Sequence, residues 1–311
     1  MDSSFEEKLD KIPVLNLLVR FLKKIKLPGF EGLSLYDLLE IYILGIVKGA
    51  LTARAGAIAF SFFMAIFPFL LFILIVIPHI PVEGFETEFM DFLKSFLPPN
   101  TSEFFFQNIF ENINSRRGGL LSSVFLLSMF LMANGVNAVF SGFENSYHEQ
   151  LNRNFFRQYI YALGVAVILA LLLIVTVAFF GYFQIYVIEN LLDTLGHNDQ
   201  MENAFWINVG KYLFFVIMVY LATATLYYFG TREGRDSRFF SVGALLTTLL
   251  IILTSYLFGV YIENFSQYNE LYGSIGALLI LMFYLWLNAN ILLLGYELNA
   301  SLNRLKKKIK L

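Results

Sequence analysis

The sequence contains no cysteine and few charged residues, and each deficit removes a class of function. Without cysteine the chain forms no disulfide and offers no thiolate, either as a nucleophile or as a metal ligand. Charged residues make up only 15% of the chain, whereas soluble domains contain about 25%. The only histidines, His79, His148 and His197, lie far apart and match no spacing typical of a metal centre or hydrolase. We therefore expect no cofactor and no metal site.

The chain has long apolar runs in place of charge. Its hydrophobic fraction is 58% and its mean hydropathy is +0.66. Six stretches have the length of about 20 residues that a helix needs to cross a bilayer core. They cover approximately 55–77, 120–140, 159–187, 204–229, 239–261 and 272–294. The sequence therefore predicts an all-α membrane protein, a bundle of six transmembrane helices with no separate soluble catalytic domain.

The basic residues indicate which way this bundle faces. Eighteen of the 22 Lys and Arg residues precede the first stretch, lie in the second or fourth connection, or follow the last stretch. The other four are Lys94, Arg116, Arg117 and Lys211. Cytoplasmic segments of membrane proteins are enriched in Lys and Arg. Both termini are therefore predicted to lie in the cytoplasm.

Three regions follow from this arrangement. Residues 1–54 are predicted to form amphipathic helices in the cytoplasm or at the membrane interface. Residues 55–300 form the six-helix transmembrane domain, which includes a helical outer loop over 78–119, and residues 301–311 form a basic cytoplasmic tail.

Two helices are predicted within the N-terminal region. Over 4–27, apolar residues recur at three- and four-residue steps, which is typical of a helix lying on a membrane. Lys23, Lys24 and Lys26 would then contact anionic lipid headgroups. A solvated helix packed on the protein's own loops is the alternative. A second helix is predicted over 34–50, leading with or without a bend into the first apolar stretch.

Polar residues inside the apolar stretches are the sharpest functional signal, because such groups are costly in lipid. Six of them suggest a polar cavity open to the cytoplasm: Arg54, Asn134, Asn137, Glu144, Asn290 and Glu297. In the predicted orientation, the three charged members lie near the inner membrane boundary. The alternative interpretation is that Arg54 and Glu297 form a buried structural pair and that the asparagines only bridge helices.

Small residues and turn formers suggest structural roles. Two rows of small residues at four-residue steps are predicted to be helix-packing seams: Gly45, Gly49, Ala53, Ala57, Ser61 and Ala65, and the three alanines Ala162, Ala166 and Ala170. Pro68 is predicted to kink the first helix. A tyrosine- and glycine-rich element precedes the last helix and is typical of an interfacial belt, with a substrate gate as the alternative. It contains Tyr268, Tyr272, Gly273 and Gly276.

Two segments resemble the YihY/BrkB family of bacterial inner-membrane proteins. One is RAGAIAFS at 54–61, which leads to Pro68. The other is YGSIG at 272–276, followed by Trp286, Asn290 and GYELNA at 295–300. The resemblance implies a six-helix protein of the bacterial inner membrane. Some members of that family were once labelled ribonuclease BN, and others were linked to serum resistance or envelope-lipid export.

Three functions remain open at this stage. The first is a transporter or flippase of a lipid-like or small amphipathic solute. The second is an envelope scaffold that transports nothing. The third, a membrane-bound hydrolase or ribonuclease, lacks clustered ligands and a basic groove with stacking aromatics. We therefore expect membrane lipids as partners and no nucleic acid, and a homo-oligomer is compatible with the packing seams.

Overall fold

The computed structural model describes residues 13–26, 34–36, 39–40, 43, 50–76, 118–146, 149–150, 155–182, 200–230, 239–264 and 274–309. In chain order, their helices and strands are α2 (Pro13–Lys24), α4 (Leu51–Val76), α8 (Gly118–Glu144), β1 (Asn145–Ser146), β2 (Glu149–Gln150), α9 (Phe155–Tyr182), α11 (Gln200–Gly230), α12 (Val242–Asn264) and α14 (Ser274–Ile309). The two strands form a minimal antiparallel hairpin after α8. The described part of the chain is otherwise dominated by helices, as its composition predicts.

Each of the six apolar stretches corresponds to one helix, from α4 for the first to α14 for the last. Five helices contain a segment that is long and apolar enough to cross a membrane. These segments are Leu126–Glu144, Phe156–Thr176, Tyr212–Gly230, Val242–Ile262 and Leu278–Asn303. In α4, the described side chains form a shorter apolar segment, Leu51–Ile66. The prediction of an all-helical fold with several membrane-crossing helices is confirmed.

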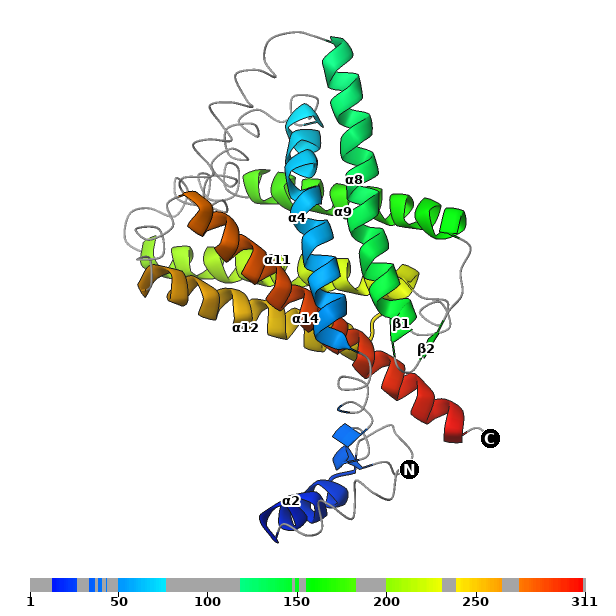
Figure 1. The fold of residues 1–311 in the computed structure, drawn as a ribbon. Coiled ribbons are helices and arrows are strands. Elements are labelled where there is room, and N and C mark those ends of the chain that lie inside the picture. Colours follow the sequence, from blue (N-terminus) through cyan, green and yellow to red (C-terminus); the bar gives the residue numbers. More distant parts are fainter. Residues whose placement is uncertain are drawn as a thin grey trace.

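The six long helices form a closed ring of packed neighbours. Each helix from α4 to α14 packs on the next one along the chain, and α14 packs back on α4. Helix α8 also contacts α11 and α14, which places it nearest the centre. Figure 1 shows α4 and α8 running in one direction while α9, α11 and α12 cross it steeply. Because membrane helices rarely tilt by more than about 40°, helices that cross this steeply must lean in opposite directions to span one bilayer.

The core lies where α8 meets α4, α11 and α14. Phe140 and Phe143 of α8 are fully buried there. Glycines allow the helices to come close. A Cβ atom on Gly142 would lie 2.8 Å from Ile58 Cδ1 of α4, and a Cβ atom on Gly230 of α11 would lie 2.8 Å from the Phe143 ring. Small residues therefore set the spacing of this core.

One of the two predicted packing seams is confirmed. In α9, Ala162, Ala166 and Ala170 are all buried. In the other seam, Gly45 and Gly49 lie outside the described residues, and the prediction was wrong at Ala53 and Ala57 of α4, which are exposed. The buried face of α4 instead carries larger side chains as well as alanine, including Ile58. A regular spacing of small residues therefore did not identify the face that packs within this chain.

The residue directly before α4 has an unusual backbone conformation. Ala50 has a φ of 45°, in the left-handed region that non-glycine residues rarely occupy. The amide nitrogens of Ala53 and Arg54 donate to its carbonyl oxygen, which starts α4. Ala50, the last residue of the helix predicted over 34–50, is therefore not helical, and most of that predicted helix lies outside the described residues. Helix α2 covers Pro13–Lys24 within the first predicted N-terminal helix, and α4 continues through Pro68 to Val76.

Several predictions fall outside the described residues. They concern most of 34–50, nearly all of the outer loop, the three histidines, and Tyr268, Tyr272 and Gly273 of the belt element. Gly276 is described and is buried in the first turn of α14.

Two glycines allow the closest helix crossing, between α12 and α14. A Cβ atom on Gly295 would overlap the Thr247 hydroxyl and lie 2.7 Å from the Gly243 carbonyl oxygen. Gly243 faces Gly295 from α12, so the two backbones meet with no side chain between them. The neighbouring atoms belong to the backbone and to short side chains, so moving them to make room for a methyl group would cost free energy.

We predict that Gly295→Ala destabilises the protein by about 1–3 kcal/mol through overpacking. The midpoint of thermal unfolding in detergent should fall. Gly259→Ala in α12 is the matched control, since nothing lies within 4 Å of the added methyl group. That control should leave the midpoint unchanged or raise it, because alanine favours helices. Equal midpoints for the two variants would show that α12 and α14 do not meet at Gly295.

Candidate functional site

The strongest polar contact in the described structure joins two residues that are far apart in sequence. Arg54 Nη2 lies 2.7 Å from Glu297 Oε1. The exposed fraction of the Arg54 side chain is 9%, and that of Glu297 is 0%. Arg54 lies in the first turn of α4 and Glu297 lies in the second half of α14. The pair is therefore a buried ion pair between two helices, as one of the two sequence interpretations proposed.

A third helix contributes to the same site. Arg54 Nη1 donates a hydrogen bond of 2.7 Å to the carbonyl oxygen of Gly142. Gly142 lies in the last turn of α8, where carbonyl groups have no partner within the helix. This end of a helix also carries partial negative charge, which a guanidinium group stabilises. One side chain thus connects α4, α8 and α14, and we call this site the Arg54 junction.

Removing either charge at the Arg54 junction should be costly. Burial takes both ions out of water, and close pairing offsets that penalty only while both partners are present. Arg54 Nε is also buried and has no hydrogen-bond partner among the described residues. The guanidinium therefore depends on Glu297 and Gly142 for its stabilisation.

Aromatic residues adjoin the Arg54 junction in sequence, because Phe143 follows Gly142 and Tyr296 precedes Glu297. Phe143 stacks on Tyr296, with ring centroids 4.3 Å apart, and meets Tyr227 edge-on at 5.5 Å. The Tyr227 hydroxyl donates to the Leu292 carbonyl oxygen at 2.6 Å and lies 2.6 Å from Thr247 Oγ1. These buried groups lower the local dielectric, which strengthens the attraction between Arg54 and Glu297.

Asn299, two residues beyond Glu297, stabilises the start of α12. Asn299 Oδ1 accepts a hydrogen bond of 2.8 Å from the backbone amide of Gly243. Asn299 Nδ2 donates to Ser241 Oγ at 2.9 Å. Ser241 Oγ accepts from the amide of Ala244 at 3.2 Å, which makes Ser241 the N-cap of α12. A side chain of α14 therefore helps to cap another helix.

The sequence alone did not assign these capping residues. Ser241 carried a signal, because a serine directly before an apolar run is typical of an N-cap. Asn299 carried no comparable signal, since its partners lie 56 and 58 residues away. It appeared only within the segment that resembles the YihY/BrkB family.

The other predicted cavity residues do not gather at the Arg54 junction in the same way. Asn134 is exposed on α8, and Asn137 is half-buried. Asn290 Nδ2 donates to the carbonyl oxygen of Trp286, one turn earlier in its own helix. Glu144 is half-buried at the end of α8, two residues beyond Gly142. The structure thus unites Arg54 with Glu297 at the end of α8 and places Asn134 on an outer face.

The described residues also bear on the chemistry that the chain can support. Among them, no three His, Asp or Glu residues lie close enough together to hold a metal ion. The Arg54 junction consists of a permanently charged guanidinium, a carboxylate and a backbone carbonyl. Such groups can hold helices together, and they can separate if the helices move.

Comparisons with known proteins agree with the resemblance seen in the sequence. The family described as Virulence factor BrkB matches residues 45–310. The ribonuclease-like protein YfkH of Bacillus subtilis (strain 168) is 26% identical over 257 residues, which cover 82% of this chain and 91% of YfkH. The UPF0761 membrane protein NT05HA_1801 of Aggregatibacter aphrophilus (strain NJ8700) is 22% identical over 266 residues, 84% of this chain and 90% of that protein.

A shorter match adds a further relative. The UPF0761 membrane protein XOO3417 of Xanthomonas oryzae pv. oryzae (strain MAFF 311018) is 40% identical over 60 residues, which cover 19% of this chain and 14% of that protein. No solved structure matches the chain. The name of YfkH refers to a ribonuclease, and nothing in the described residues shows enzymatic activity.

A double-mutant cycle tests the Arg54 junction. We predict that Glu297→Leu and Arg54→Met each destabilise the protein by about 3–5 kcal/mol, because each leaves one buried charge unpaired. The double variant should lose less than the sum of the two, since it leaves neither charge buried. Unfolding in detergent at several denaturant concentrations measures all four proteins. Strictly additive losses would mean that the two side chains do not interact.

Proposed function

Because the chain belongs to the BrkB family, together with membrane proteins of other bacteria, we propose that it is a multi-pass protein of the bacterial inner membrane with six membrane-spanning helices. In this proposal α4 also crosses the membrane, in addition to the five helices with long apolar segments. Both termini lie in the cytoplasm. The excess of Lys and Arg in alternate connections supports this orientation.

The way in which helix ends meet also supports this topology. Helices that cross a bilayer in alternation bring the starts of α4, α9 and α12 to the same side as the ends of α8 and α11. The contacts follow that pattern. Arg54 near the start of α4 bonds Gly142 near the end of α8. Gln158 near the start of α9 donates to Ser141 near the end of α8 at 3.3 Å.

Helix α2 would then lie along the cytoplasmic face of the membrane. The side chains of Lys23, Lys24 and Lys26 are exposed, which suits contact with anionic headgroups, and Lys23 Nζ also lies 4.8 Å from the centre of the Tyr36 ring. Figure 1 shows α2 at the same end of the structure as the C-terminal end of α14. This placement agrees with a basic, cytoplasmic end of the protein.

Within this topology we infer that the protein is a transporter or flippase of a lipid-like or small amphipathic solute. The Arg54 junction is the observation that carries the inference. It is a buried ion pair near the inner membrane boundary that holds three helices together at one end. Burying a charge inside membrane helices costs free energy, and such charges mostly occur at functional sites. Ion pairs that connect helices are also the contacts that break and re-form when such proteins change state.

The junction in this structure corresponds to a state closed at the cytoplasmic side. Opening would separate Glu297 from Arg54 and expose the polar residues nearby, among them Glu144 and Asn290. The predicted polar cavity would then belong to the open state. A solute of mixed polar and apolar character suits such a path, because the polar residues near the junction adjoin long apolar runs of α4 and α14.

A non-transporting scaffold is the second candidate. The exposed small residues Ala53 and Ala57 of α4 favour it, because a row of small residues lets a helix of another protein, or of a second copy, approach closely. In that case the Arg54 junction would be purely structural.

Chemical labelling tests the topology. The chain contains no cysteine, so each single-cysteine variant reports one position. We predict that cysteines at Ser3 and Ser237 react with a membrane-impermeant maleimide only from the cytoplasmic side, and that a cysteine at Asn198 reacts only from the outside. Spheroplasts and inverted membrane vesicles provide the two orientations. Labelling of Ser3 and Ser237 from opposite sides would exclude the six-span topology.

Reconstitution into liposomes with fluorescent lipids tests transport. If the ion pair adds about 3 kcal/mol to the closed state, Glu297→Gln should shift the closed–open equilibrium by about a hundredfold and change the rate of transbilayer movement. Tyr227→Phe is the control, because it loses buried hydrogen bonds without touching the ion pair. Its rate should match that of the wild type. The absence of protein-dependent movement for every lipid tested would rule out a flippase.

A further inference from the structure

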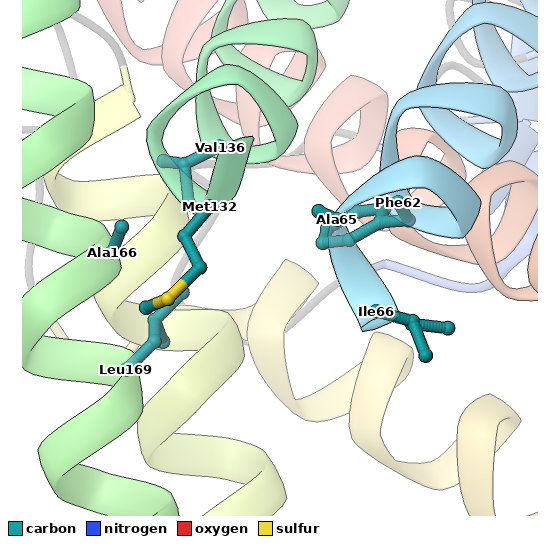
Figure 2. A pocket seen from close by; sticks show the side chains of 7 residues that line it. All are labelled: Phe62, Ala65, Ile66, Met132, Val136, Ala166 and Leu169. Carbon is teal, nitrogen blue, oxygen red and sulfur yellow. The ribbon is translucent and has the colours of Figure 1, made fainter. Parts of the chain in front are cut away.

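A cavity of about 220 Å³ lies between α4, α8 and α9, separate from the Arg54 junction. Its lining is apolar throughout. As Figure 2 shows, Met132 and Val136 line it from α8, Phe62 and Ala65 from α4, and Ala166 and Leu169 from α9. The two alanines leave space where larger residues would fill it.

The cavity lies on the inner faces of these helices. Met132, Val136, Ala65 and Ala166 are between 3% and 6% exposed. Neighbouring residues on the same helices point outward, and their large apolar side chains are exposed. They include Met64, Leu127, Phe130, Ile168 and Leu171. The outer surface of these helices therefore suits lipid, whereas these four lining residues are buried between the helices.

The depth of the cavity follows from its distance to the Arg54 junction. Ala65 lies eleven residues beyond Arg54 in α4, which corresponds to about 16 Å along a helix. The hydrocarbon core of a bilayer is about 30 Å thick. If the Arg54 junction marks the inner boundary of that core, the cavity lies close to the middle of the membrane.

Physical chemistry restricts what can fill such a space. An apolar cavity of about 150 Å³ stays dry and binds hydrocarbons such as benzene, and this cavity is larger. Water would find no polar partner in its lining. An empty space would leave the lining atoms without dispersion contacts. At this depth the abundant molecules are the hydrocarbon chains of lipids.

We propose that this cavity binds one acyl chain of a membrane lipid. The favourable free energy of binding comes from the dispersion contacts made when the space is filled. The hydrophobic effect adds little, because a lipid chain is already in an apolar medium. Met132 is unbranched and flexible, so it can adapt to chains of different shape. The path into the cavity runs between α4 and α9, which both pack on α8 and otherwise pack mainly on α14 and α11.

The proposal does not depend on transport. A protein that binds a lipid chain at this position could be a transporter, for which the chain would be part of the substrate. A scaffold could hold the same chain as a fixed component. The test below therefore measures binding without measuring transbilayer movement.

Photo-crosslinking in a bilayer tests the proposal. The full-length protein is reconstituted into vesicles of phosphatidylethanolamine and phosphatidylglycerol that contain phosphatidylethanolamine with a diazirine at the middle of one acyl chain. After illumination, mass spectrometry locates the labelled residues. We expect labels on Met132, Val136 or Ala166, because these residues are buried and a lipid chain contacts them only by entering the cavity. Labels confined to exposed residues such as Leu127 and Leu171 would overturn the proposal.

A pair of variants on α9 provides the matched control. Leu169→Trp places an indole ring in the cavity, whereas Leu171→Trp makes the same change on an exposed position of the same helix. We expect the label on Met132 and Val136 to be lost in Leu169→Trp and kept in Leu171→Trp. Labelling that persists in Leu169→Trp would overturn the proposal, provided that the variant elutes and unfolds like the wild type. If Leu169→Trp fails to fold, Ala166→Leu takes its place in the same comparison.

The outcome is independent of the liposome experiment on transport. Labelled cavity residues in a protein that moves no lipid would leave this inference standing and remove the flippase. Lipid movement without label in the cavity would support a flippase and overturn this inference.

Discussion

A single guanidinium group connects three of the six long helices. Arg54 in α4 pairs with Glu297 in α14 and also bonds a carbonyl oxygen at the end of α8. In an apolar medium neither charge can be left alone, so the three helix ends have to stay together or separate in a way that re-solvates both ions. That constraint positions the first and last long helices of the chain against each other and closes the ring.

The segment of α14 around Glu297 extends the constraint to a fourth helix. Gly295 allows α12 to approach closely, Asn299 helps to cap the start of α12, and Tyr296 stacks on Phe143 of α8. Four contacts with three other helices thus arise from five consecutive residues. A movement of α14 at this point would disturb its contacts with α4, α8 and α12 together. Such an element could couple the proposed opening at one end to the rest of the bundle.

Much of this architecture was predictable from the sequence, and the limits have physical causes. The apolar stretches predicted the long helices to within a few residues at most ends, because the thickness of a bilayer imposes a minimum length. Arg54 and Glu297 were predicted to lie near the same membrane boundary, and pairing was one of the two interpretations. The exposure of Ala53 and Asn134 was not predicted, because a repeat of residue types along a helix does not say which face another helix covers. The apolar cavity depends on side-chain volumes from three helices, and no local pattern encodes it.

We propose that the Arg54 junction closes the cytoplasmic end and that its rupture opens it. Electron–electron distance measurements in vesicles test this most directly, with spin labels on cysteines at Thr52 of α4 and Asn303 of α14, near the two sides of the junction. The absence of native cysteine makes the labelling specific. The account predicts one narrow distance distribution for the wild type and a second, longer population in Glu297→Gln. An unchanged single distribution in Glu297→Gln would contradict it.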